Sequence, residues 1–352
     1  MTLESFELIR ILFLATVAFL LAQTWQPALM KLLRQFKAGK TIRDSKEAPV
    51  FAKLHAKKAG TPTMGGLLIW VTVLALALLF SYADKLFPST SFLSQLNFLT
   101  RSETLLPLRA LVAAALVGFV DDYFNIKKKG AHGGGLRARH RLAIYTLIAL
   151  VGALWFYLKL DWDLLRIPFI GDFNLGWWYI PFFMLVIVST CFSVNETDGL
   201  DGLAGGVLMT SFGAYAIIAF SQGKFDLAVF CAVILGALLA FLWHNIHPAK
   251  FFMGDTGAMS LGVTLGIVAM LTNTAFILPV IGIIFVAESA SVILQISWRK
   301  ILKKKLFRSA PFHHHLEAID WPEPQIVMRL WLVSMIAAAV GVALALMDAL
   351  VI

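Results

Sequence analysis

Apolar residues gather in long runs along this chain, and short polar stretches separate the runs. Ten runs approach 20 residues, the length at which an α-helix crosses about 30 Å of hydrocarbon. Most lack the polar face that a helix of a soluble protein turns to water. The pattern predicts ten membrane-spanning helices, at about 7–30, 64–82, 105–121, 142–160, 177–194, 203–221, 225–244, 258–274, 276–298 and 326–348.

Composition agrees with this pattern. Of 352 residues, 59% are hydrophobic and 14% charged, whereas a soluble domain carries about 25% charged residues. The first run has no signal-peptide cleavage site, so we expect a retained helix. Cys191 and Cys231 both lie in apolar runs and indicate neither a disulfide framework nor a metal cluster. The sequence predicts an all-α polytopic membrane protein with one domain over residues 1–352.

The basic residues set the expected topology. Of 30 Lys and Arg, nine lie in 31–63, six in 122–141 and six in 299–325. Positive loops stay in the cytoplasm, so we expect five cytoplasmic loops and two periplasmic termini. Lys58, Lys128 and Lys304 should then face the cytoplasm, and Ser91 the opposite side. This topology explains the net charge of +9 better than nucleic-acid binding does.

One outward loop has a different pattern. Between Asp161 and Trp178, apolar residues alternate around Ile170-Gly171-Asp172. Alternation about a glycine turn is typical of a β-hairpin, so we expect a short periplasmic hairpin here.

The first predicted cytoplasmic loop ends in Lys57-Lys58-Ala59-Gly60-Thr61-Pro62-Thr63-Met64-Gly65-Gly66. Paired glycines allow another backbone or a ligand to approach closely. A plainer interpretation is a helix N-terminus with threonine caps. The loop by itself favours neither interpretation.

Carboxylates mark the next loops. Asp121 and Asp122 lie where an apolar helix is expected to end, and ionisable groups at membrane depth are functional candidates. Such a pair can bind Mg²⁺, orient a phosphate or take a proton. The alternative, a solvated helix end, is disfavoured because negative charge opposes the dipole at a helix C-terminus.

Two further loops add acids and glycines. The segment 195–203 reads Asn-Glu-Thr-Asp-Gly-Leu-Asp-Gly-Leu and has no Lys or Arg, contrary to the positive-inside trend. A metal, a basic neighbour or a ligand must compensate its acids. In 250–257, Phe252 could stack on a base and Asp255 could hold Mg²⁺. Alternatively, Asp255 or Thr256 caps the next helix.

The last loop contains His313-His314-His315. Three consecutive side chains cannot easily face one zinc ion, so we do not expect a zinc site. Histidine can instead donate to phosphates or act as acid or base at cytoplasmic pH.

Together these loops place carboxylates, histidines, glycine turns and cations on one membrane face. Mg²⁺-dependent phosphate chemistry fits this set. A channel would spread polar residues across the bilayer, and a transporter would place a site at its midplane. We expect an interfacial enzyme with one soluble charged substrate and one lipid substrate, and we rank a lipid or ion transporter well behind it.

The motifs GTPTMGG, GFVDDY, the aspartate-rich segment 195–206, FFMGDTGA and APFHHHLE with Trp321-Pro322-Glu323 occur in that order. In this the chain closely resembles the bacterial phospho-N-acetylmuramoyl-pentapeptide transferases (lipid I synthases) of the polyprenyl-phosphate N-acetylhexosamine-1-phosphate transferase superfamily. The resemblance runs from about Ile42 to Arg329. GTPTMGG and the histidine motif are the more specific signals, because the aspartate motifs are shared across the superfamily.

The resemblance implies transfer of phospho-MurNAc-pentapeptide from UDP-MurNAc-pentapeptide to undecaprenyl phosphate, with Mg²⁺, in the bacterial inner membrane. The catalytic residues would be Asp121, Asp122, Asp255 and His313, with Asp255 as the metal ligand and Asp121 on the acceptor phosphate. The uridine side would be lined by Lys58, Asn195, Asp198, Asp201 and Phe252. His313, His314 and Gln295 would bind the diphosphate and sugar, and Thr63 and His315 complete the substrate-binding set. Attack could be direct or through an aspartyl phosphate.

Partners and rivals follow from the same resemblance. The substrates, membrane lipids and a homodimer are the candidate partners, and nucleic acid is not expected. A sister transferase that uses another UDP-sugar would share every aspartate. The chain departs from the family pattern at Asn125, at the glycine-rich segment 130–135, at Glu196 and across Trp243–His247. These departures bear on the lipid-phosphate contacts more than on the reaction.

Overall fold

The computed structural model describes residues 2–36, 38–39, 58, 60–87, 92–101, 103–128 and 135–351. Ser91 and most of the glycine-rich segment 130–135 lie outside this part of the chain. Within it, a long helix occupies each of the ten predicted segments. They are α1 (Leu3–Gln35), α3 (Leu67–Leu86), α5 (Leu105–Ile126), α6 (Ala138–Lys159), α7 (Tyr179–Thr197), α8 (Leu203–Ser221), α9 (Phe225–Asn245), α10 (Asp255–Leu271), α12 (Ile283–Leu302) and α14 (Glu323–Val351).

Seven of these helices, α1, α3, α6, α7, α8, α9 and α14, are long and apolar enough to cross a membrane. The all-α polytopic class is therefore confirmed. The apolar α10 has only 17 residues. The other two carry charged side chains, including Asp121 in α5 and Glu288 in α12. A total of ten spans stays a prediction.

Several helix boundaries differ from the predicted ones, and two of the differences change the picture. The segment 276–298 is not one helix, because a short α11 (Leu278–Ile281) ends at Gly282 before α12 begins. In addition, α5 continues to Ile126, so Asp121 and Asp122 lie inside its last turns and are buried.

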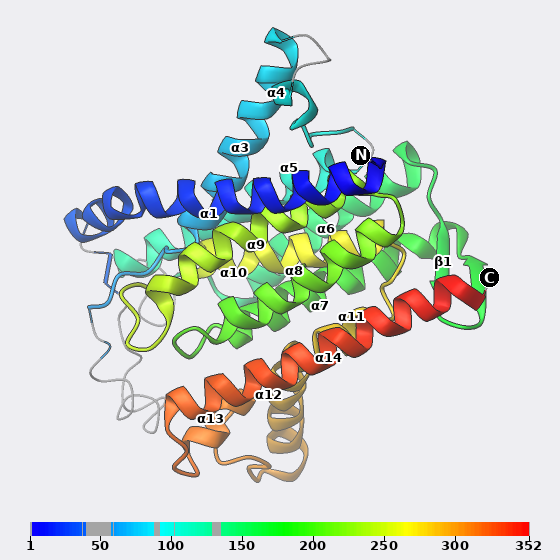
Figure 1. Cartoon of the computed structure of the whole chain (residues 1–352). Helices are drawn as coiled ribbons and strands as arrows, with labels where there is room; N and C mark the ends of the chain where they lie inside the picture. The colour runs from blue at the N-terminus through cyan, green and yellow to red at the C-terminus, as the bar shows by residue number, and fades with distance from the viewer. Residues whose placement is uncertain are drawn as a thin grey trace.

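The centre of the bundle is formed by α8, α9 and α10, in which most residues are buried, and in α10 nearly all of them. Helix α10 packs against α5 and α7, while α9 packs against α1 and α8 (Figure 1). Outer helices turn large apolar side chains outward, such as Leu12 of α1 and Ile336 of α14. Lipid accommodates such surfaces, because helices satisfy their own backbone hydrogen bonds.

One end of the bundle holds both termini and the predicted hairpin (Figure 1). Strands β1 (Leu164–Ile167) and β2 (Gly171–Asn174) pair antiparallel, which confirms the hairpin. Arg166 and the Phe169 amide bond to Asp348 of α14, which joins the hairpin to the C-terminal helix.

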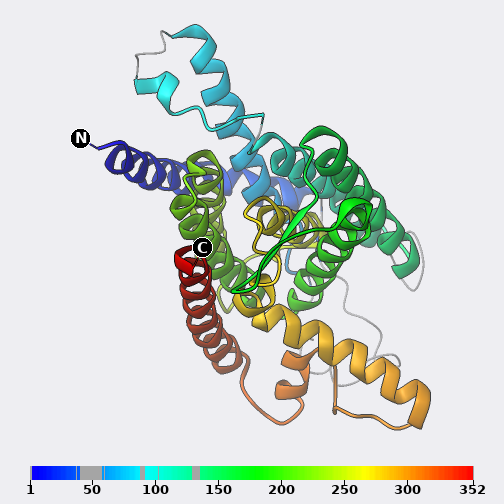
Figure 2. The ribbon, with the colours of Figure 1, turned by 90° about the vertical axis from the view of Figure 1, so that its right-hand side faces the viewer.

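The opposite end carries the loops with the predicted chemistry. Beside it, α12 leaves the bundle at an angle and leads back through α13 (Phe312–Glu317) to α14 (Figure 2). A short helix of four residues, α4 (Phe92–Gln95), lies between α3 and α5.

Candidate active site

The glycine-rich turn before α3 pairs with the turn before α10. The Gly65 and Gly66 amides donate to the carbonyls of Phe252 and Met253 at 2.7 and 2.8 Å. A Cβ on Gly66 would lie 2.3 Å from the Cα of Gly257, and one on Gly65 would strike the Phe251 ring. The glycine pair is therefore explained by the close approach of another backbone, one of the two predicted possibilities.

Asp122 caps α10 from a different helix. Its Oδ2 accepts the Thr256 amide hydrogen at 3.0 Å, and only 4% of the residue is exposed. The residue before α10 is Gly254, with a positive φ of 74° and no side chain to cap with. Capping by Asp255 or Thr256 was thus the wrong interpretation, because a carboxylate from α5 supplies the acceptor. A carboxylate at a helix N-terminus also stabilises the dipole.

Close packing makes this cap possible. A Cβ on Gly118 of α5 would lie 2.3 Å from the Asp255 carbonyl oxygen. The Thr256 hydroxyl donates to the Ala115 carbonyl at 2.8 Å. The two helices therefore meet at backbone distance, which holds Asp121, Asp122 and Asp255 in one place.

We define the Asp255 cluster as Asp255, Asp121, Arg141 and Asn195. The Asn195 amide donates to Asp255 Oδ1 at 2.7 Å. Arg141 Nη1 lies 3.5 Å from Asp255 Oδ2 and 3.9 Å from Asp121 Oδ2. The Leu136 amide donates to Asp121, so both carboxyls of the cluster are held next to Arg141.

The Asp255 cluster fits a hard divalent cation. Arg141 is farther from both carboxylates than the 2.7–2.9 Å of a charge-assisted hydrogen bond. Two adjacent carboxylates with one loosely placed guanidinium leave negative charge to be compensated. Mg²⁺ is typically held by one or two carboxylates together with substrate phosphates and water, so Asp255 and Asp121 offer a suitable donor set.

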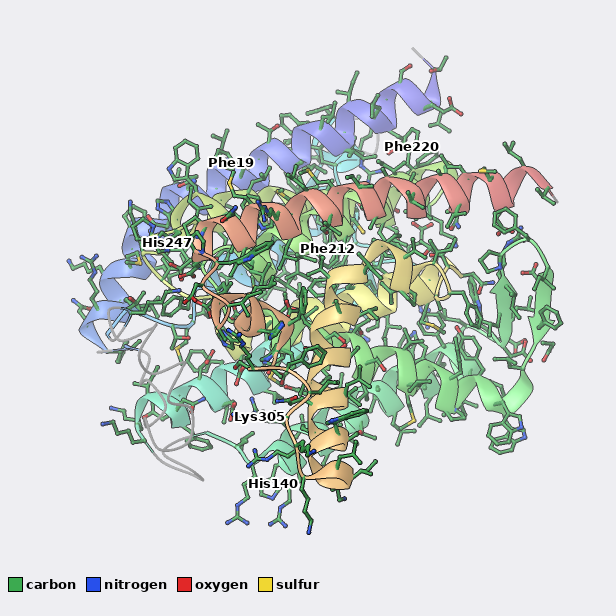
Figure 3. All side chains as sticks on the ribbon, turned by 90° about the horizontal axis from the view of Figure 1, so that it is seen from below. Phe19, His140, Phe212, Phe220, His247 and Lys305 are labelled. Carbon is green, nitrogen blue, oxygen red and sulfur yellow. The ribbon has the colours of Figure 1, made fainter. Side chains whose placement is uncertain are left out.

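We define the Lys58 cluster as Lys58, Asp201, His247 and Glu323. Lys58 Nζ lies 2.7 Å from Asp201 Oδ1 and also contacts Glu323 Oε1. Burial alone would raise the pKa of Asp201, but the hydrogen bond and charge of Lys58 outweigh it. The pKa of Asp201 therefore lies below its ordinary value. Figure 3 shows His247 near the start of α14, where Glu323 is the first residue.

Shared loops join the two clusters. Asp198 and Asp201 belong to the α7–α8 loop, and the Gly254 amide donates to Asp198 Oδ2 at 3.2 Å. The turn before α10 carries both Asp255 and Phe252, whose ring centroid lies 6.0 Å from Lys58 Nζ. The Thr63 hydroxyl lies next to Gly254, because a Cβ on this glycine would be only 2.7 Å from the hydroxyl oxygen. The structure thus brings the residues predicted for the uridine side close to the Asp255 cluster.

The three consecutive histidines have different hydrogen-bond partners. His313 Nδ1 is 2.9 Å from Glu288 Oε2, and His314 Nδ1 is 2.6 Å from Glu317 Oε2. The ring of His315 instead accepts the Arg308 amide hydrogen. The rings of His313 and His314 are nevertheless in edge contact, with centroids 4.1 Å apart.

The histidine helix nevertheless reaches the site. His313 is fully buried, and a Cβ on Gly199 would lie 2.1 Å from its Nε2. Gln295 faces elsewhere, since its side-chain amide bonds to Leu306 and Phe307 of the loop before α13.

Comparisons with known proteins address the family. A glycosyl transferase family 4 model matches residues 104–273, and the phospho-N-acetylmuramoyl-pentapeptide-transferase signature 1 matches residues 58–69. Three proteins named phospho-N-acetylmuramoyl-pentapeptide-transferase align over nearly the whole chain. The protein of Chloroflexus aggregans (strain MD-66 / DSM 9485) is 38% identical over 97% of this chain and 90% of its own length. That of Shouchella clausii (strain KSM-K16) is 40% identical over 94% and 96%, and that of Bacillus subtilis (strain 168) is 37% identical over 94% and 97%.

The chain belongs to the phospho-N-acetylmuramoyl-pentapeptide-transferase family. The glycosyl transferase match spans Asp121, Asp122, Asp198, Asp201 and Asp255 but ends before the histidines, while the signature begins at Lys58.

Four residues at or beside the site were not predicted as site residues. Arg141 was expected only as part of a basic segment that sets topology and could bind phosphate, although it lies close to two predicted site carboxylates. Glu323 was part of a quoted motif, and His247 lay in a departure from the family pattern. Glu288 had no signal except its charge within an apolar helix, a feature that marks functional candidates in membranes.

Proposed function

We propose that this membrane protein transfers phospho-MurNAc-pentapeptide from UDP-MurNAc-pentapeptide to undecaprenyl phosphate, giving lipid I and UMP. Family membership over nearly the full chain supports the reaction class. The observation that carries the proposal is the Asp255 cluster, which gathers two carboxylates, an amide and a guanidinium from four helices at one end of the bundle. Such a cluster suits phosphate chemistry that needs a divalent cation.

Asp255 would hold Mg²⁺, which when bound supplies charge for the phosphate oxygens. Asp121 is placed beside it to orient the acceptor phosphate or take its proton, with Arg141 Nη1 3.9 Å from its Oδ2. Arg141 would add a cation for phosphate oxygens, a role suited to a planar guanidinium. Asp122 would have a different role from Asp121. Its side chain accepts the Thr256 amide hydrogen at the start of α10, so it would support the position of Asp255.

The donor would lie across both clusters. Its uracil would stack on Phe252, with Lys58 beside the diphosphate and Asp198 and Asp201 on the same loop. His313 and His314 would approach the diphosphate and sugar past Gly199. Gln295 could bind the same part of the donor only if its hydrogen bonds to the backbone of residues 306–307 were broken.

We place both clusters on the cytoplasmic face of the inner membrane. The support is the concentration of Lys and Arg in the loops at this end. A soluble donor would then arrive from the cytoplasm, while the acceptor headgroup would enter at the membrane surface.

The test is UMP release by the purified protein from UDP-MurNAc-pentapeptide with undecaprenyl phosphate, with and without Mg²⁺. We expect release only when all three are present. A sister transferase would instead prefer UDP-GlcNAc in a competition assay, and the signature match at residues 58–69 argues against this. Equal rates with both nucleotide sugars would contradict the proposed donor.

A further inference from the structure

Glu323 and His247 form the outer half of the Lys58 cluster and have no part in the reaction proposed above. We propose that both are positioning residues that hold the Lys58 ammonium in place for the uridine diphosphate end of the donor. This inference rests on the proposed function, and it concerns donor affinity and not the chemical step.

Glu323 connects two residues of the predicted uridine side. Its Oε1 contacts Lys58 Nζ and also accepts the Asp201 backbone amide hydrogen at 2.8 Å. Lys58 Nζ therefore lies between two carboxylates, one from the α7–α8 loop and one from the start of α14. Because Glu323 opens a long helix that packs on α8, its position is fixed by the bundle.

His247 closes the cluster from the α9–α10 loop. Its Nδ1 is 3.0 Å from Asp201 Oδ2 and 3.6 Å from Glu323 Oε2, and the Ala249 amide donates to the same Asp201 oxygen. The His247 side chain is 42% exposed, whereas Asp201 is 3% exposed. Asp201 is therefore held on both oxygens, with His247 as the weaker, solvent-facing contact.

A metal is a weaker interpretation of this cluster. One ligand atom each from Asp201, His247 and Glu323 lie within 4.8 Å of one another. The Lys58 ammonium already contacts both carboxylates, so it supplies the cation that such a set requires. A second cation beside the ammonium would be repelled.

Lysine has a flexible four-carbon stem and samples many conformations unless its ammonium is held. Two carboxylates hold it 6.0 Å from the Phe252 ring centroid, next to the predicted base site. Ordering the lysine before the donor arrives lowers the entropic cost of binding. Loss of that order should weaken donor binding and leave turnover at saturation unchanged.

The test compares Glu323→Gln with Asp320→Asn, a matched control that also removes one charge. Asp320 is exposed and lies three residues before Glu323. Glutamine can still accept the Asp201 amide hydrogen, so the fold is retained and only the charge opposite Lys58 is lost. We expect Glu323→Gln to raise the KM for UDP-MurNAc-pentapeptide about tenfold, a typical consequence of weakening a hydrogen bond to a charged group. The kcat and the KM for undecaprenyl phosphate should stay unchanged, as should every parameter of Asp320→Asn.

Direct binding gives a second readout. UDP titrated calorimetrically into detergent-solubilised protein should bind Glu323→Gln about tenfold more weakly, and His247→Asn about two- to threefold more weakly because that contact is exposed. The double variant Glu323→Gln/Lys58→Met should bind UDP no more weakly than Lys58→Met alone, because Glu323 acts through Lys58.

Several results would overturn the inference. They are unchanged UDP affinity in Glu323→Gln, additive effects in the double variant, or a fall in kcat with equal rises in both KM values. The failure of the proposed function is a separate outcome. A wild-type protein that binds UDP but releases no UMP would contradict the reaction, while the UDP titrations would still test the positioning of Lys58.

Discussion

The Asp255 and Lys58 clusters share one end of the bundle but are neutralised differently. In the Lys58 cluster, the ammonium contacts two carboxylates directly, and Asp201 has partners on both oxygens. In the Asp255 cluster, Arg141 stands 3.5 and 3.9 Å from its two carboxylates. In the first set the cation touches its carboxylates, whereas in the second the guanidinium stands farther from both than a charge-assisted hydrogen bond.

This difference separates positioning from chemistry. Buried polar groups with all partners present define a rigid arrangement, which suits the recognition of a constant nucleotide. A cluster with incomplete compensation can bind and release ligands whose charge changes during a reaction. The predictions below test this division, from the largest expected effect to the smallest.

The largest effects are expected within the Asp255 cluster. Asp255→Asn should abolish UMP release and weaken Mn²⁺ binding together, because few charged oxygens hold the ion. Asp121→Asn should slow turnover by about 10²–10⁴-fold if Asp121 removes a proton, with donor binding retained. Initial rates and spectroscopic Mn²⁺ titrations measure both variants. Metal binding lost only in Asp121→Asn would reverse the two roles.

An intermediate effect is expected beside the Lys58 cluster. Phe252→Ala should remove about 1–3 kcal/mol of base stacking and so raise the KM for the UDP substrate at least several-fold. The KM for undecaprenyl phosphate should hardly change. Phe252→Tyr keeps a stacking ring and serves as the control. Equal effects of Phe252→Ala on both substrates would remove Phe252 from the uracil site.

A smaller effect, on stability, is expected for Asp122→Asn. Asparagine can still accept the Thr256 amide hydrogen but lacks the charge that favours a helix N-terminus. We expect a loss of at most about 1 kcal/mol, the size of a charge effect at a helix N-terminus, seen as a lower Tm in thermal unfolding. Residual activity should clearly exceed that of Asp121→Asn. If the two variants were equally inactive at full stability, Asp122 would act in catalysis.

The smallest perturbation tests the shared membrane face. Single cysteines at Ile170 in the hairpin and at Lys304 after α12 replace exposed side chains, so activity should be unaffected. A membrane-impermeant maleimide added to intact cells should label the Ile170 cysteine and not the Lys304 cysteine. Labelling of both from outside would contradict a cytoplasmic active site.

Much of the architecture follows from local patterns. Apolar runs predicted the positions of ten helices, and alternation about Gly171 predicted the hairpin. Both depend on residues close together in the chain, which is why periodicity is sufficient. The break at Gly282 was missed because the chain is apolar on both sides of this glycine, and hydropathy does not distinguish a broken helix from an intact one.

For the site, too, local patterns predicted some features and missed others. Motifs predicted that Lys58, Asp121, Asp201 and Asp255 carry the chemistry. The family resemblance implied that Asp121 acts on the acceptor phosphate and that Asp122 assists, but the residues alone could not separate the two, because both are aspartates and adjacent in sequence. The structure separates them, since Asp122 bonds to the α10 amide while Asp121 reaches Arg141.

By itself, the sequence determined a polytopic membrane protein, its family and the loops in which charged groups accumulate. Only the tertiary structure decided how those charges are paired. Lys58 meets Glu323 across 265 positions of sequence, and Asp122 meets Thr256 across 134. Such pairs are fixed by helix packing, with glycines such as Gly66 and Gly118 setting how closely backbones approach. Electrostatic energy depends on distance in space, so the pairing of these residues was settled by packing and not by their order in the chain.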